Sequence, residues 1–136
     1  MMLIGYGFLI VYLRFHRWQS LGLTFFVAAF SAQLYILFAA FWYRWWWGFI
    51  GKAYNIVTFD LIAAIKGSIG CLIALGALIG KVDILQMVFF WLIFVIFYTL
   101  DEAIIFFSIY AHDIGGWFYI HTFSSCFGIV ATWIYS

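Results

Sequence analysis

The chain has 136 residues, of which 69% are hydrophobic and only 8% are charged. Soluble domains carry roughly 25% charged residues, so a chain with a mean hydropathy of +1.16 has too few polar side chains to form a water-exposed surface. We therefore expect an integral membrane protein without a separate soluble domain. The formal net charge of +1 provides no basic surface for nucleic acid, so we expect no nucleic-acid partner.

Polar clusters divide the sequence into five continuous apolar runs. A spanning helix needs about 20 apolar residues, whereas a barrel strand needs about ten residues that alternate between apolar and polar. Because the runs are continuous, they predict an all-α integral membrane fold of about five transmembrane helices. They make up a single membrane domain, residues 1–136. The approximate predicted helices are residues 2–13, 19–43, 53–79, 84–109 and 114–135.

The second predicted helix ends in a cluster that is typical of the membrane–water interface. Arg44 is followed directly by Trp45, Trp46 and Trp47. Tryptophan and basic side chains gather at the level of the lipid headgroups, where an amphipathic ring meets both water and hydrocarbon. We therefore expect this end of the helix to lie at the headgroup level.

Small residues mark one face of the third predicted helix. Ala63, Gly67 and Cys71 are four residues apart, so they lie on one face and allow a neighbouring helix to approach closely. We expect the third and fifth helices to be among the most buried. Cys71 and Cys126 lie in apolar runs without metal or redox spacing, so we expect buried thiols that act as small hydrophobes, with no metal site and no cofactor.

Ionisable groups inside a membrane cost free energy and are therefore candidates for function. Such positions are Asp60, Lys66, the Asp101–Glu102 pair and His121. His121 lies about five residues inside the last predicted helix, at a depth where an ionisable residue is rare. Two interpretations are open: a histidine that hydrogen-bonds to a neighbouring backbone or hydroxyl group, and a histidine that takes part in transport.

The pattern of these residues does not favour an enzyme. The sequence has no recognisable nucleophile–base pair, His/Glu metal motif or glycine-rich phosphate loop. Asp101 and Glu102 are adjacent, so on a helix they point about 100° apart and form a poor acid–base pair. We therefore expect no enzymatic activity and no catalytic residues.

Several short motifs resemble those of the Rh glycoproteins and ammonium transporters. The motif that begins the family's fifth core helix is matched, in the same order and spacing, by Asp113, the Gly115–Gly116 pair and the run Ile120–Phe123. Upstream, residues 80–86 resemble the family's turn between its third and fourth helices. The resemblance covers essentially the whole chain and only the first of the family's two inverted repeats.

This resemblance implies a fold like one half of an Rh channel and a narrow apolar pore for ammonia. In the family, two stacked phenylalanines stand above two hydrogen-bonded histidines. The resemblance implies that His121 corresponds to the first of those histidines and Asp113 to the structural acid at the start of the fifth helix. It also implies that Glu102 corresponds to an acidic residue of the outer vestibule.

The chain departs from the family pattern in ways that count against conduction. Only the first repeat is present, so the second pore histidine is missing. Lys66 occupies the position of a gating phenylalanine, where an ammonium group would repel a passing cation. Trp117 replaces a small polar residue one turn from His121, where an indole would tend to fill the vestibule.

These departures favour a non-conducting half-channel that is an accessory or structural subunit of a larger membrane complex. Its expected partners are membrane lipids and other membrane protein subunits. Many Phe residues and an absence of Pro suggest an AT-rich genome, such as that of an organelle, so we expect a mitochondrial inner-membrane respiratory or ATP-synthase assembly. The alternative is an ammonia channel that this chain forms with a second half or with an inverted copy of itself.

Overall fold

The computed structural model describes residues 3–5, 7, 17–48, 54–111, 113 and 115–135. The predicted helix 2–13 therefore lies outside the described residues except at 3–5 and 7, which are helical. The other elements are α2 (Arg17–Trp47), α3 (Thr58–Gly76), α4 (Ile84–Ile104) with its π-helical extension η1 (Ile105–Ile109), and the π-helical turn η2 (Trp117–Thr122) that leads into α5 (Phe123–Ile134). No strand occurs in these ranges.

Three segments are long and apolar enough to cross a membrane. They are Leu21–Trp46, Thr58–Gly76 and Ile84–Ile109, counted among the described residues only. The all-α membrane architecture expected from composition is thus confirmed. The number of five transmembrane helices remains a prediction.

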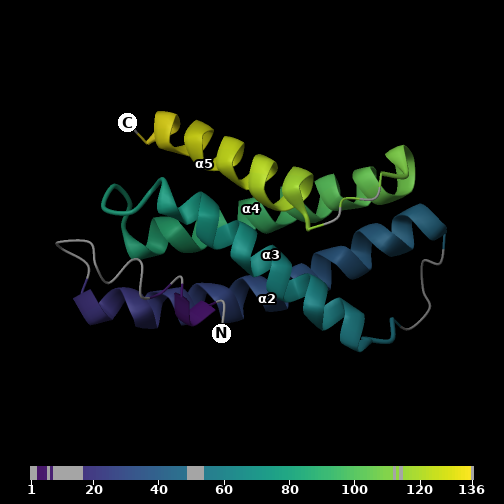
Figure 1. Ribbon diagram of the computed structural model, residues 1–136, viewed down its shortest axis with the longest axis horizontal. Coiled ribbons are helices and arrows are strands. Elements are labelled where there is room, and N and C mark those ends of the chain that lie inside the picture. Colours follow the sequence, from purple (N-terminus) through teal and green to yellow (C-terminus); the bar gives the residue numbers. More distant parts are fainter. Residues whose placement is uncertain are drawn as a thin grey trace.

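Helix α3 lies at the centre of the described structure. It packs against α2 on one side and against α5 on the other, and it also contacts α4 and η2 (Figure 1). Its buried residues include Gly67 and Cys71, and Ala63 packs against the edge of the core. The small side chains of α3 therefore lie at helix–helix contacts.

Two contacts show how little space these helices leave. A Cβ atom added to Gly67 would lie 2.8 Å from the Tyr35 ring, and one added to Gly128 of α5 would lie 2.9 Å from the carbonyl oxygen of Ala74. The second contact is with backbone, so α5 rests almost directly on the main chain of α3. Thr132 supports this contact by donating a hydrogen bond to the Ala77 carbonyl oxygen over 3.0 Å.

The expectation that the fifth helix is among the most buried is wrong for this chain. Only Ser124, Gly128 and Ala131 of α5 are buried, whereas Trp133 is 80% exposed. Cys126 is also exposed, which corrects the expected burial of both thiols, and Cys71 is buried as expected. The reason is geometric: α5 packs on the bundle along one narrow face and leaves the rest of its apolar surface uncovered.

We expect Gly128→Ala to destabilise the fold. The new methyl group would press on the Ala74 carbonyl, which cannot move without shifting α3, so overpacking should reduce the free energy of unfolding by about 1–3 kcal/mol. The measurement is helicity during chemical unfolding in detergent micelles. Gly22→Ala in α2 is the matched control because nothing lies within 4 Å of its added Cβ. An equal loss of stability in both variants would contradict the packing argument.

Candidate functional site

The only buried carboxylate among the described residues belongs to Glu102, near the end of α4. Its side chain is 5% exposed, and the hydroxyl group of Tyr35, from the middle of α2, donates a hydrogen bond to Oε2. Tyr98, one helical turn earlier on α4, packs its ring 6.1 Å from that of Tyr35. The carboxylate therefore lies at the α2–α4 contact, enclosed by aromatic rings.

Lys66 supplies a positive charge to the same region. It lies near the middle of the α3 span and its side chain is exposed, and it interacts electrostatically with Glu102. An intramembrane cation is tolerated where an opposite charge is near. Lys66, Glu102 and Tyr35 thus form a polar cluster contributed by three different helices.

His121 belongs to a second group, on η2. Its imidazole ring is exposed and lies 4.9 Å from the ring of Trp117, measured between centroids, at an interplanar angle of 39°. Trp117 is itself 66% exposed. The indole therefore covers one side of the imidazole, and among the described residues no further helix covers the pair.

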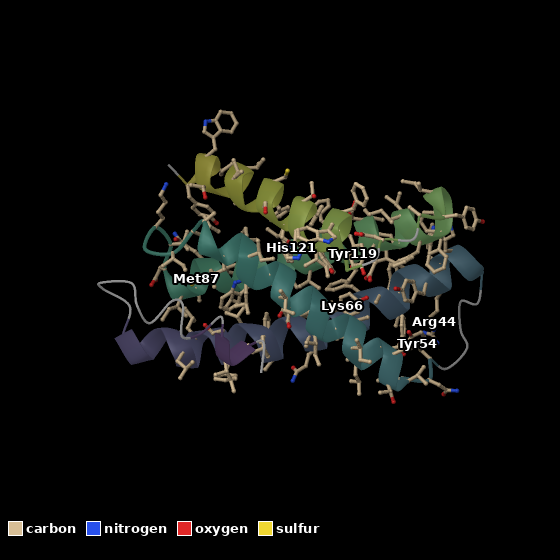
Figure 2. The ribbon with its side chains drawn as sticks, in the orientation of Figure 1. Arg44, Tyr54, Lys66, Met87, Tyr119 and His121 are labelled. Atoms are coloured by element: carbon tan, nitrogen blue, oxygen red, sulfur yellow. The ribbon has the colours of Figure 1, made fainter. Side chains whose placement is uncertain are left out.

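The two groups lie close together in the fold. Figure 2 shows Lys66, Tyr119 and His121 near the middle of the long axis, away from both ends of the bundle. Helix α3, which carries Lys66, contacts η2, which carries His121. The buried Tyr119 of η2 packs its ring 6.3 Å from that of Tyr98, so one aromatic contact joins η2 to the helix of Glu102.

Asp113 holds the start of η2 in place. Its Oδ2 atom accepts a hydrogen bond from the backbone N–H of Phe118 over 2.6 Å. Gly115 and Gly116 between them have φ angles of +97° and +75°, which side chains with a Cβ rarely adopt. The aspartate and the two glycines therefore direct the chain into the helix that presents Trp117 and His121.

Sequence reasoning missed the hydroxyl groups around this site. Tyr35 was not singled out, although it lies in an apolar run and reaches Glu102. Tyr98 and Ser124 are fully buried, and neither hydroxyl oxygen has a hydrogen-bond partner among the described residues. The available signal was a hydroxyl side chain in the middle of an apolar run, but the partner helix could not be read from it.

Asp101 and Asp60 take no part in the hydrogen-bonded contact between Tyr35 and Glu102. Asp101 is half-buried and interacts electrostatically with Glu102, its neighbour on α4, but it makes no hydrogen bond to Tyr35 or Glu102 in the described part of the chain. Asp60 lies in the first turn of α3, where Oδ2 accepts a hydrogen bond from the Val57 N–H over 2.9 Å. No group of three or more His, Cys, Asp or Glu residues that could hold a metal occurs in the part of the chain that is described.

The comparisons with known proteins point to one group of relatives. No family model matches the chain. Over 98% of its length it is 34% identical to the ammonium transporter Rh type C of Oncorhynchus mykiss and 33% identical to that of Canis lupus familiaris. It is 31% identical to the Rhesus-like glycoprotein A of Dictyostelium discoideum, also over 98%. The chain spans only 26–28% of the length of these relatives.

Two tyrosines allow the Glu102 contact to be tested with a matched pair. Tyr35 and Tyr98 are each 1% exposed, but only the Tyr35 hydroxyl group is bonded to a carboxylate. We expect Tyr35→Phe to reduce the free energy of unfolding by about 1–3 kcal/mol, because it leaves a buried acceptor without its donor.

Tyr98→Phe should be neutral or stabilising, since it removes a hydroxyl group that has no partner in the described structure. Chemical unfolding in detergent, followed by circular dichroism, measures both effects. A larger loss in Tyr98→Phe than in Tyr35→Phe would contradict the assignment of Tyr35 as the donor that stabilises Glu102.

Proposed function

Because this chain is homologous over almost its whole length to part of the Rh-type ammonium transporters, we propose that it is an Rh-type half-channel that does not conduct and acts as an accessory subunit of a larger membrane complex. The observation that carries the proposal is the exposed cation Lys66 near the middle of α3, beside the helix that presents His121. By resemblance to the family, this position corresponds to a phenylalanine that gates the pore.

The surroundings of Lys66 include an opposite charge. Glu102 interacts with it electrostatically, and Tyr35 stabilises the glutamate by hydrogen bonding. A fixed cation in a narrow apolar passage raises the energy of an ammonium ion there, because the low dielectric constant screens like charges poorly. Lys66 therefore acts as an electrostatic block at the former gate.

Trp117 supports the same conclusion. In a conducting pathway the imidazole of His121 would offer a polar contact and a site of proton exchange to the passing molecule. The indole of Trp117 lies against that imidazole instead. The exposed face that carries both rings is then a surface for packing against another membrane segment.

Ammonia transport is the second candidate function. It is favoured by the names of the relatives, which describe ammonium transporters. In this case another membrane segment, from a second half or an inverted copy, covers the face with His121 and completes the pathway. Lys66 must then be neutral or turned aside.

The proposed assembly is a respiratory or ATP-synthase complex of the mitochondrial inner membrane, with lipids and other membrane subunits as partners. Composition alone supports this location, through the abundance of Phe and the absence of Pro. Mass spectrometry of the complex extracted in mild detergent identifies the companion subunits. Companions that belong to a different membrane would contradict the location and leave the half-channel proposal standing.

Ammonia flux separates the two functions. The native assembly is reconstituted in proteoliposomes that contain a pH-sensitive dye, and an Rh type C transporter serves as the positive control. We expect no flux above that of protein-free vesicles, either for wild type or for Lys66→Phe, because Trp117 still covers His121. Substantial wild-type flux would overturn the accessory role and support transport.

The accessory role also predicts an effect on assembly. Lys66→Ala removes the charge that balances Glu102 and should weaken co-purification of the chain with its companions. Lys81→Ala, an exposed lysine in the α3–α4 turn, is the matched control and should leave co-purification unchanged. Equal recovery of companions in both variants would contradict a role for Lys66 in the assembly.

A further inference from the structure

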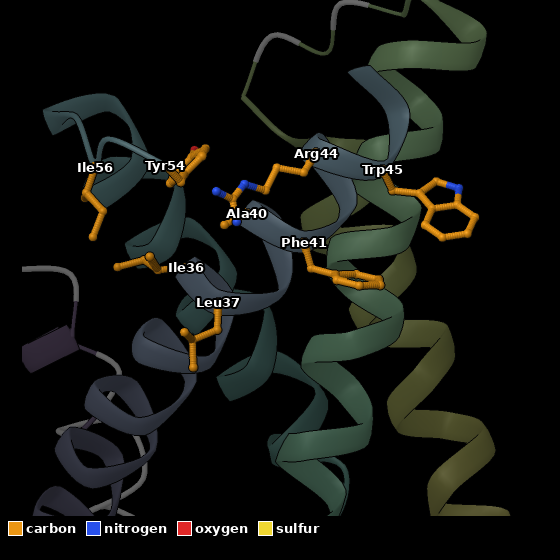
Figure 3. Close-up of a pocket in the computed structure, with 8 residues that line it drawn as sticks. All are labelled: Ile36, Leu37, Ala40, Phe41, Arg44, Trp45, Tyr54 and Ile56. Atoms are coloured by element: carbon orange, nitrogen blue, oxygen red, sulfur yellow. The ribbon is translucent and has the colours of Figure 1, made fainter. Parts of the chain in front are cut away.

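A groove outside the site described above lies where the second half of α2 meets the segment that leads into α3 (Figure 3). Its volume is about 500 Å³, within the range of ligand-binding pockets. The walls are mainly apolar, formed by Ile36, Leu37, Phe41 and Ile56, and the polar groups come from Arg44 and Tyr54. Such a combination suits an amphipathic ligand.

The apolar wall is positioned to contact hydrocarbon. Leu37 is 66% exposed, Phe41 53% and Ile56 59%. Leu37 and Phe41 are one turn apart on α2, inside the apolar span Leu21–Trp46. An acyl chain can lie along such a concave apolar surface. It then touches protein atoms on more than one of its sides, which increases the number of dispersion contacts.

Arg44 lies at the level where lipid headgroups are expected. It is two residues from the end of the apolar span, next to Trp45, and both residue types gather at the membrane–water interface. Figure 3 shows its guanidinium group directed across Ala40 towards Tyr54. The positive charge therefore stands at the headgroup end of the apolar groove.

Asp60, which contacts the groove residue Tyr54, already has hydrogen-bond partners. Tyr54 donates a hydrogen bond to Asp60 Oδ1 over 2.9 Å, and the Val57 N–H donates to Oδ2 over 2.9 Å. Burial and the Asp60 carboxylate raise the pKa of Tyr54 to about 12, so the phenol keeps its proton at neutral pH. Arg44 makes no ion pair with any described carboxylate, which leaves its charge available to a ligand.

We propose that this groove binds an anionic phospholipid, with the phosphate on the Arg44 guanidinium group and an acyl chain along Leu37 and Phe41. The planar guanidinium fork matches the geometry of phosphate oxygens. A lipid with a net negative charge is preferred over a zwitterionic one, because the latter brings its own cation to the phosphate. The inference stands independently of whether the chain conducts ammonia.

Native mass spectrometry of the intact chain in non-ionic detergent tests this proposal. The chain is titrated with phosphatidylglycerol and with phosphatidylcholine of the same acyl chains. Phosphatidylglycerol should bind more tightly, and Arg44→Gln should weaken its binding about fivefold, which is the effect of one basic residue near an anionic lipid surface. Arg44→Lys, which keeps the charge and loses the planar fork, should fall between wild type and Arg44→Gln.

Lys81→Gln is the matched control, because it removes one positive charge in the α3–α4 turn, away from the groove. It should leave phosphatidylglycerol binding unchanged. Circular dichroism verifies that every variant is folded, and the ratio of the two lipids within one variant is independent of its stability.

Several results would overturn the proposal. Equal affinity for the two lipids would exclude a preference for anionic headgroups, and equal weakening by Lys81→Gln and Arg44→Gln would indicate attraction by net charge alone. Competition by inorganic phosphate as effective as that by the lipid would identify a free-anion site. A dimer that binds no lipid would show that a second copy of the chain covers the groove.

Discussion

Gly67 and Gly70 of α3 and Gly128 of α5 determine how closely these two helices approach their neighbours. A Cβ atom on Gly67 would lie 2.8 Å from the Tyr35 ring, one on Gly70 2.8 Å from the Ser124 hydroxyl oxygen, and one on Gly128 2.9 Å from the Ala74 carbonyl oxygen. Inside a membrane, lipid tails are as apolar as the side chains, so helices associate through close packing rather than through the hydrophobic effect. The remaining contacts of the site depend on this packing.

The polar cluster of Tyr35, Glu102 and Lys66 is a direct consequence of that approach. Because Gly67 leaves room for the Tyr35 ring, the Tyr35 hydroxyl group reaches Glu102 on α4, and the neighbouring Lys66 stays within electrostatic range of the same carboxylate. A carboxylate buried without a donor or a countercharge would be costly in this environment. The cluster therefore couples α2, α3 and α4 electrostatically as well as sterically.

Asp60 and His121 illustrate where sequence reasoning reached its limit. Asp60 was predicted to lie inside a helix that begins at residue 53, but α3 begins at Thr58 and the carboxylate accepts bonds at its first turn. Periodicity marks a helix without marking its first residue, since the cap is defined by local hydrogen bonds. His121 was recognised from its motif, and Trp117 was recognised one turn away from it, whereas the exposure of both rings depends on how η2 packs.

The sequence by itself determined that this is a membrane protein, because a chain with so few charged residues cannot form a water-exposed surface. It also determined the small face of α3, and it predicts that the end of α2 with Arg44 and the adjacent tryptophans lies at the membrane interface. Only the tertiary structure decided that Tyr35 bonds Glu102 and that Arg44 stands over an apolar groove. Composition and spacing act along one chain segment, whereas these features require side chains from different segments to meet at specific distances.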